Sequence, residues 1–139
     1  MARSEVVFTD GGLEKALRNA LKKSRKHATR AATECAIDLA AKSSQLAPID
    51  MGDLRNNCKA VVNGVVVYAN QQETGLSPQP FREPEVEVSY DLIYARRQHE
   101  ELSYRHPKGG QAKYLEEPFL ANATQYAERI RKAVIDALD

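Results

Sequence analysis

The spacing of apolar residues predicts a long helix over residues 11–46. Apolar positions recur there at intervals of three, four and seven residues, which is the period of an α-helix. These positions are Leu13, Leu17, Leu21, Ala28, Ala32, Cys35, Leu39 and Leu46. Asp10 is placed to cap the helix, and Pro48 ends it because the residue before a proline avoids helical geometry. A helix of this length spans about 50 Å, so we expect it to kink or to project beyond a compact core.

The middle of the chain has the features of a small antiparallel sheet. Residues 48–55 indicate a turn that leads into a strand, and the valine-rich runs 59–62 and 65–68 are joined by Asn-Gly. Asn-Gly between two such runs predicts a β-hairpin, because both turn positions need positive φ. Residues 85–90 alternate between polar and apolar side chains, which predicts a further strand. We therefore expect three or four strands within residues 54–94.

A long loop is predicted within this sheet, over residues 69–84, where three prolines and one glycine occur. We expect this loop to be mobile in the free protein and to serve binding or assembly. Leu76 and Phe81 are its apolar residues, with Arg82 beside them. Either the two apolar side chains insert into a partner, or they fasten the loop to its own core.

The last third of the chain predicts a short helix and loop over residues 95–117 and a closing helix over 118–138. Pro118 suits the first turn of that helix. Its apolar stripe consists of Leu120, Ala123, Ala127, Ile130, Val134 and Leu138. We expect this helix to pack on the sheet beside the first one, so residues 1–139 form a single α+β domain.

Composition sets limits on function but does not assign one. The net charge is +1, and 42% hydrophobic and 28% charged residues are ordinary values for a globular protein. Cys35 and Cys58 lie in different predicted elements and form no Cys-x-x-Cys motif, which favours two reduced, buried thiols. The sequence has no run of eighteen apolar residues and no apolar segment near its start. We expect a protein that is made, and used or assembled, in the cytoplasm.

Charge is unevenly distributed along the chain. Residues 11–46 contain eight Lys/Arg and three Asp/Glu, whereas residues 71–101 contain three Lys/Arg and seven Asp/Glu. Lys15, Arg18, Lys22 and Arg25 fall on one stripe of the long helix. This stripe is either a solvated face or a surface for nucleic-acid phosphate or an acidic protein. The second reading makes residues 15–30 a DNA-binding helix.

Residues 90–118 hold four of the six tyrosines and two of the three histidines, so we considered them as an active site. His99, Glu100 and His106 do not have the His-Glu-x-x-His spacing of a zinc site, and no nucleophile or phosphate-binding motif occurs. A nuclease built on Arg97, His99 and Glu100 is not singled out by the spacing either. We therefore expect a structural hinge, with no catalytic residue, metal or cofactor. Tyr94, His99 and Tyr114 should be buried or lie at a subunit contact, and Arg97 joins them as an interface residue.

Three short segments, taken in order, resemble a known family. They are residues 47–55 (APIDMGDLR), 94–100 (YARRQHE) and 110–116 (GQAKYLE). Together with the long helix that precedes them, they resemble the minor structural proteins of long-tailed bacteriophages. These are minor capsid, neck, tail-completion and tail-to-head joining proteins. The resemblance covers residues 11–138 in order, and each motif is short, so the order and spacing carry it. Met51 departs from the family, which usually has a threonine that helps to cap this turn.

The resemblance implies assembly and no enzymatic activity. Family members form a ring, of six subunits, between the portal-side connector and the tail tube. Such a ring completes the tail end and lets it join the DNA-filled head. The implied partners are other copies of the chain, the head connector or stopper protein, the tail-tube protein and DNA that passes through the lumen. The implied location is the virion, at the head-tail junction, after assembly in the host cytoplasm.

Overall fold

The fold is α+β, as the sequence predicts. The computed structural model describes residues 12–48, 54–90 and 113–138. Its elements are α1 (Gly12–Leu46), α2 (Leu54–Asn57), β1 (Lys59–Val62), β2 (Val65–Ala69), β3 (Gln72–Glu73), β4 (Val86–Ser89) and α4 (Glu116–Leu138). The predicted turn at Met51 and Gly52, the predicted strand end at 91–94 and the predicted short helix and loop up to residue 112 lie outside the described residues.

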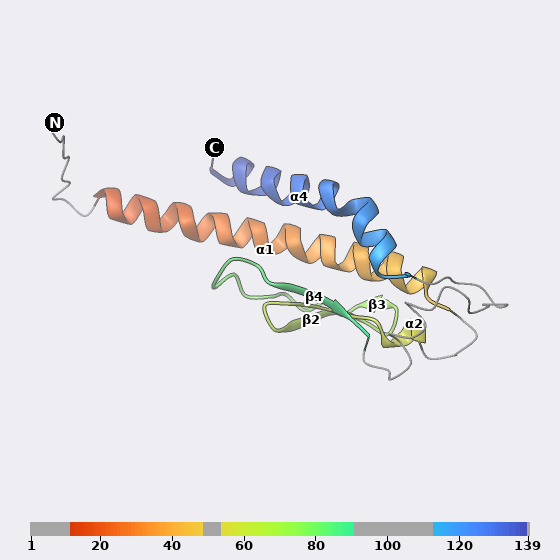
Figure 1. The fold of residues 1–139 in the computed structure, drawn as a ribbon. Coiled ribbons are helices and arrows are strands. Elements are labelled where there is room, and N and C mark those ends of the chain that lie inside the picture. The colour runs from red at the N-terminus through yellow and green to blue at the C-terminus, as the bar shows by residue number, and fades with distance from the viewer. Residues whose placement is uncertain (1–11, 49–53, 91–112, 139) are drawn as a thin grey trace, which may run out of the picture.

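The long helix α1 is the middle layer of the molecule. The sheet packs on one side of α1, and α4 packs along the other (Figure 1). α1 is continuous over 35 residues, and its N-terminal part extends past both the sheet and the end of α4 (Figure 1). Of the two expected outcomes for this helix, projection beyond the core is therefore confirmed.

The hairpin forms as predicted. β1 and β2 pair antiparallel, and the connecting residues Asn63 and Gly64 have φ angles of 49° and 81°. Positive φ at both positions gives the tight turn that suits the right-handed twist of two strands. β4 pairs with the other side of β1, and β3 pairs with β2, so the strand order is β3-β2-β1-β4.

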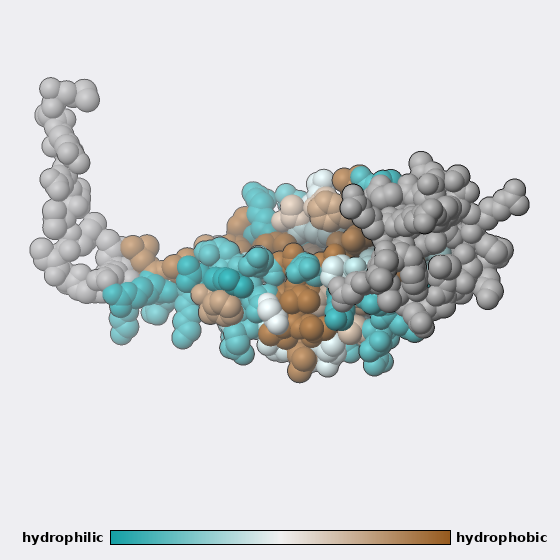
Figure 2. Space-filling model, turned by 60° about the horizontal axis from the view of Figure 1, so that its bottom comes forward, coloured by the Kyte–Doolittle hydropathy of each residue, from teal (hydrophilic) through white to brown (hydrophobic). Residues whose placement is uncertain are grey.

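A β-bulge in the hairpin increases the number of core residues that β2 supplies. Ala60 is the partner of Tyr68 and Val61 is the partner of Val66, which leaves Val67 as an extra residue. As a result, Val67 and Tyr68 are both buried, although they are consecutive in sequence. Val61 and Val66 lie opposite each other and are half-buried, and Figure 2 shows hydrophobic surface in the middle of the sheet on the side away from α1.

Two expectations for the segments that flank the hairpin are wrong. The predicted turn into a strand at residues 48–55 ends instead in the short helix α2. There Leu54 is fully buried and the Arg55 Nε donates to the Ala47 carbonyl at 2.7 Å. This bond satisfies a carbonyl left free at the end of α1. The predicted loop 69–84 is also not a loop throughout, because it contains the short strand β3.

α4 begins at Glu116, two residues before the predicted start, and Pro118 is buried in its first turn. Of the predicted apolar stripe, Ala123, Ile130 and Val134 are half-buried, but Leu120 and Leu138 are 65% and 54% exposed. Ala127 is exposed too. The stripe is therefore displaced from the face that α4 turns to α1. That face carries polar contacts at Asn122, Tyr126 and Arg129, which apolar periodicity does not reveal.

The core consists of two adjacent clusters. The larger one places Ala36 and Ala40 of α1 against Cys58, Ala60, Val62, Val67 and Tyr68. The smaller one joins Ala47, Leu54 and Tyr114, and Tyr90 packs against both clusters. The alanines let the sheet approach the backbone of α1 closely, so their abundance in this helix is used for packing.

Candidate assembly surfaces

The N-terminal half of α1 is a basic, exposed rod. Residues 15–26 include six Lys/Arg and no Asp/Glu. Lys15, Arg18 and Lys22 of the predicted stripe are exposed. Arg25 is the exception, since it is half-buried and forms an ion pair with Glu83 at 3.4 Å. Most of the basic stripe is thus exposed to solvent. That it binds nucleic acid or an acidic protein surface stays a prediction.

Two leucines lie exposed on the same rod. Leu17 and Leu21 are 62% and 47% exposed. They lie on the same apolar face of α1 as Ala28, Cys35 and Leu39, which are buried further along the helix. Figure 2 shows this projecting part as hydrophilic surface with hydrophobic spots between the polar side chains. Periodicity places both leucines on the apolar face of the helix but does not identify them as surface residues. Only the positions of the sheet and α4 show which half of that face is covered.

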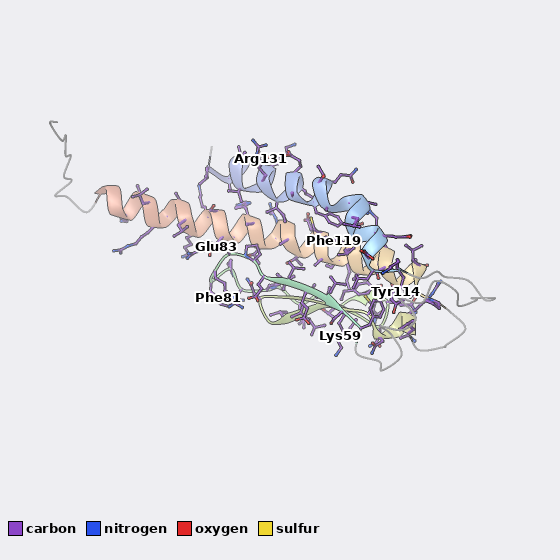
Figure 3. The ribbon with its side chains drawn as sticks, in the orientation of Figure 1. Lys59, Phe81, Glu83, Tyr114, Phe119 and Arg131 are labelled. Atoms are coloured by element: carbon purple, nitrogen blue, oxygen red, sulfur yellow. The ribbon has the colours of Figure 1, made fainter. Side chains whose placement is uncertain are left out.

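The loop between β3 and β4 presents its apolar residues to solvent. Leu76 and Phe81 are 59% and 60% exposed, so neither fastens the loop to the core. The Arg82 guanidinium lies over the Phe81 ring at 4.8 Å and pairs with Glu85 at 3.3 Å. Figure 3 shows Phe81 and Glu83 at the end of the sheet nearer the projecting half of α1. The structure therefore brings the predicted loop residues close to Arg25.

Asn63 holds this loop in place from the hairpin turn. Its backbone N–H donates to the Glu85 carbonyl, its side-chain Oδ1 accepts from the Glu85 N–H, and its Nδ2 donates to the Gln79 carbonyl, each at 3.0 Å. At the opposite end of the loop, Thr74 bonds to the Val66 and Val67 carbonyls. The loop is thus tied at both ends while Leu76 and Phe81 remain exposed.

Acidic residues gather where the loop enters β4. Glu83, Glu85 and Glu87 are all exposed. A hydrogen bond from its own backbone and the nearby Arg25 charge lower the pKa of Glu83 below its usual range. The three carboxylates therefore form an acidic surface beside β4, opposite in sign to the projecting half of α1.

An apolar groove of about 460 Å³ runs between β4 and the first turns of α4. Its lining consists of Leu39, Val86, Val88, Leu115, Glu116 and Phe119. Val86 and Phe119 are 44% and 48% exposed, so hydrophobic area is open to solvent there. Figure 3 shows Phe119 on the first turns of α4, beside α1. The sequence does not predict this groove, because residues 86–88 and 115–119 are far apart in the chain and only the fold brings them together.

Tyr114 belongs to the core. It is 1% exposed, and its ring meets the Tyr90 ring edge-on with centroids 5.0 Å apart. The Tyr90 hydroxyl in turn shares a 2.6 Å hydrogen bond with Ser43 of α1. Tyr114 was expected to be buried or to lie at a subunit contact, and its burial in the core is therefore confirmed. The other three residues proposed in this stretch, Tyr94, Arg97 and His99, lie outside the described residues.

Both thiols are protected from ionisation. Burial raises the pKa of the Cys58 thiol from 9.0 to about 11, and burial likewise raises the pKa of Cys35. A raised pKa makes a thiol a poor nucleophile at neutral pH. Within the described ranges, no three His, Cys, Asp or Glu side chains are grouped closely enough to hold a metal ion.

The α1–α4 contact carries a polar network. Asp38 accepts from the Tyr126 hydroxyl at 2.5 Å and pairs with Lys42 at 2.8 Å. Burial opposes ionisation of Asp38, but the hydrogen bonds from Lys42 and Tyr126 outweigh it and lower the pKa of this carboxyl. Burial and the Asp38 hydrogen bond raise the pKa of Tyr126. The network helps to fix how α4 lies on α1.

No protein-family model, curated protein or solved structure matches the chain. In the part of the chain that the structure describes, neither long helix is apolar enough to cross a membrane.

Proposed function

We propose that this chain is a structural protein of a bacteriophage virion. It forms a ring of six copies at the head-tail junction, completes the tail end and joins the tail to the head connector. The ring docks on the connector or stopper protein at one face and on the tail-tube protein at the other. Its chemistry is that of recognition between surfaces, without a catalytic step.

The observation that carries this proposal is the projecting half of α1. A monomeric protein gains little from a helix that extends past its own core with Leu17 and Leu21 exposed. Helices of this length are stabilised mainly by packing of their apolar face. A neighbouring subunit supplies that packing in an assembly.

The packing of two resemblance motifs also supports the proposal. Ala47 and Leu54 come from the first motif and Tyr114 from the third, and these residues form one buried cluster. The Arg55 side chain of the first motif closes the end of α1. The two motifs therefore pack together as one structural unit, although they are far apart in the chain.

Deletion of the coding sequence from the phage genome tests this function. Electron microscopy of the resulting lysate should show filled heads and separate tails in place of complete particles. Supply of the protein from a plasmid should restore joined particles. Heads already joined to normal tails in the deletion lysate would contradict the proposal.

The basic rod favours a second candidate, a DNA-binding accessory protein that uses residues 15–30. Lys15, Arg18 and Lys22 are exposed along one stripe, as phosphate contacts require. This candidate predicts binding of duplex DNA with a steep loss of affinity as salt rises. Fluorescence anisotropy of wild type and of the Lys15→Glu, Arg18→Glu, Lys22→Glu variant separates the two candidates. Equal retention of DNA by both proteins removes the second.

A further inference from the structure

The uncovered half of the apolar face of α1 needs a partner surface outside its own chain. The covered half of this face begins near Ala28 and includes Leu39, which lines the groove beside β4. Leu17 is 22 residues from Leu39 on one continuous helix, which is a distance of about 33 Å. The two leucines therefore cannot reach the groove of their own chain.

The groove beside β4 has the properties that the two leucines require. A helix that docks by anchors at i and i+4 needs an open apolar channel, and Leu17 and Leu21 have this spacing. The groove offers Val86 and Phe119, which are 44% and 48% exposed. Its volume of about 460 Å³ is in the range of binding grooves for apolar side chains.

Charge is complementary along the same two surfaces. Residues 15–26 of the rod include six Lys/Arg and no Asp/Glu. Among the exposed Lys15, Arg18 and Lys22, Arg18 lies nearest to the side of the helix that carries the two leucines. On the groove side, Glu116 lines the channel, where it pairs with Lys113 at 3.2 Å. The exposed Glu85, just before β4, and Glu87, within β4, add negative charge nearby. Opposite charge on two surfaces favours their encounter and the matching partner over others.

We propose that the projecting half of α1 of one copy docks in the β4–α4 groove of the next copy, with Leu17 and Leu21 as the anchors. This inference rests on the proposed function, in which copies of the chain surround one another. The contact joins two different surfaces, so a bound pair still has one free groove, on the first copy, and one free rod, on the second, for further neighbours. Such a head-to-tail contact closes into a ring when the rotation per subunit allows it.

Mass photometry of the full chain tests the contact in solution. Wild type should form assemblies heavier than the 15.5 kDa chain. The Leu17→Asp, Leu21→Asp variant should shift to the monomer mass, and added salt should also weaken wild-type association. The matched control is Asn19→Asp, Lys23→Gln, which makes the same change in charge on the opposite side of the helix. This control should assemble as wild type does.

Two variants test the groove. Phe119→Asp places a charge in the channel, and Glu85→Lys, Glu87→Lys reverses only exposed carboxylates. Each should give monomers that keep the wild-type circular dichroism spectrum. The Glu85→Lys, Glu87→Lys variant changes no residue of the core, so it should fold normally. It therefore still tests the groove if Phe119→Asp fails to fold.

A mixing experiment distinguishes this contact from a symmetric pairing of rods. The Leu17→Asp, Leu21→Asp chain retains its groove, and the Phe119→Asp chain retains its rod. Mixed at equal concentration, they should form a heterodimer of twice the chain mass and nothing larger, because the remaining surfaces are both blocked. Pairing of rod with rod gives no heterodimer in this mixture and overturns the proposal.

Wild type that stays monomeric at high concentration also overturns the proposal. These results are independent of the phage experiment. Copies that associate as described, combined with a deletion phage that still joins heads to tails, would leave the contact standing and refute only the proposed location.

Discussion

Asn63 has two separable tasks. Its φ of 49° lets β1 turn into β2, and its side chain holds the loop through Gln79 and Glu85. Asparagine and glycine both accept this backbone conformation, but only asparagine supplies the side-chain bonds. The sequence alone assigns the first task, since Asn-Gly is a hairpin signal. The second task cannot be read from the sequence, because it depends on the fold bringing residues 79 and 85 next to Asn63.

The Asn63→Gly variant should keep the hairpin and lose the ties to the loop. Two side-chain hydrogen bonds are removed, so we expect a loss of about 1–3 kcal/mol in the free energy of unfolding. Asn63→Asp keeps the acceptor for Glu85 and loses the donor to Gln79, and should lie between the two. Urea denaturation measures all three proteins. An Asn63→Gly variant as stable as wild type would show that the ties contribute nothing.

Buried hydroxyls and a thiol line the contact between α1 and the sheet. Tyr90 bonds to Ser43, Tyr68 bonds to Ser44 at 2.9 Å, and the Cys58 thiol donates to the Ala40 carbonyl at 3.7 Å. Burial raises the pKa of Tyr90 and of Cys58, because the charged form of each side chain would lose its hydration in the core. Loss of either proton therefore works against folding.

Stability should fall as pH rises from 9 to 11. Cys58 has a pKa of about 11 when folded and an ordinary value of 9.0, so the folded state binds more protons across this window. The free energy of unfolding then decreases with pH, by on the order of 2 kcal/mol from this group. Tyr90 extends the decline above pH 10. Urea denaturation at several pH values measures the decline.

The Cys58→Ala variant is the control for this decline. It is less stable at every pH because a buried sulfur is removed, but its curve should be flatter than that of wild type between pH 9 and 11. Parallel curves for the two proteins would rule out Cys58 as the source.

At the scale of elements, periodicity predicted each long helix but not the face by which α4 packs. The hairpin and the ends of α1 follow from chemistry within a few residues, such as Asn63-Gly64 and Pro48. The orientation of α4 depends instead on Tyr126 and Arg129, which find Asp38 and Glu34 on a different helix. A pattern of apolar residues gives these polar contacts no weight. The groove beside β4 was not predicted for a different reason, because residues 86–88 and 115–119 are far apart in the chain and come together only in the fold.

The alanines of α1 set the distance between helix and sheet. Ala36 is 2% exposed in the larger core cluster, whereas Ala16 on the same helix is exposed. Ala36→Leu should therefore overpack the layer and lower the free energy of unfolding by about 1–3 kcal/mol. Ala16→Leu is the matched control and should change it by less than about 0.5 kcal/mol. Thermal and urea unfolding of both variants decide the matter, and equal stabilities would contradict close packing at Ala36.

At the scale of the whole molecule, the residues that form the core are distinct from the exposed apolar residues that we propose for recognition. The sheet, the second half of α1 and Tyr114 form the core, while Leu17, Leu21 and Phe81 stay exposed. The unequal charge of the two regions was visible in the sequence. Its arrangement as a basic rod at one end and an acidic strand edge beside a groove was not, because that requires the position of β4 next to α4.

The exposed loop residues provide the last test of this separation. Leu76→Ser, Phe81→Ser removes two side chains that are 59% and 60% exposed, and leaves the Asn63 and Thr74 ties intact. The melting temperature should therefore stay close to that of wild type, since exposed substitutions change stability by less than about 0.5 kcal/mol. If the proposed ring docks through this loop, complementation of the deletion phage should nevertheless fall about tenfold or more, because the loop has lost two apolar side chains that would anchor it. Ser77→Ala, Gln79→Ala is the control in the same loop and should complement fully. Full infectivity of the Leu76→Ser, Phe81→Ser phage would show that the loop does not contact the connector or the tail tube.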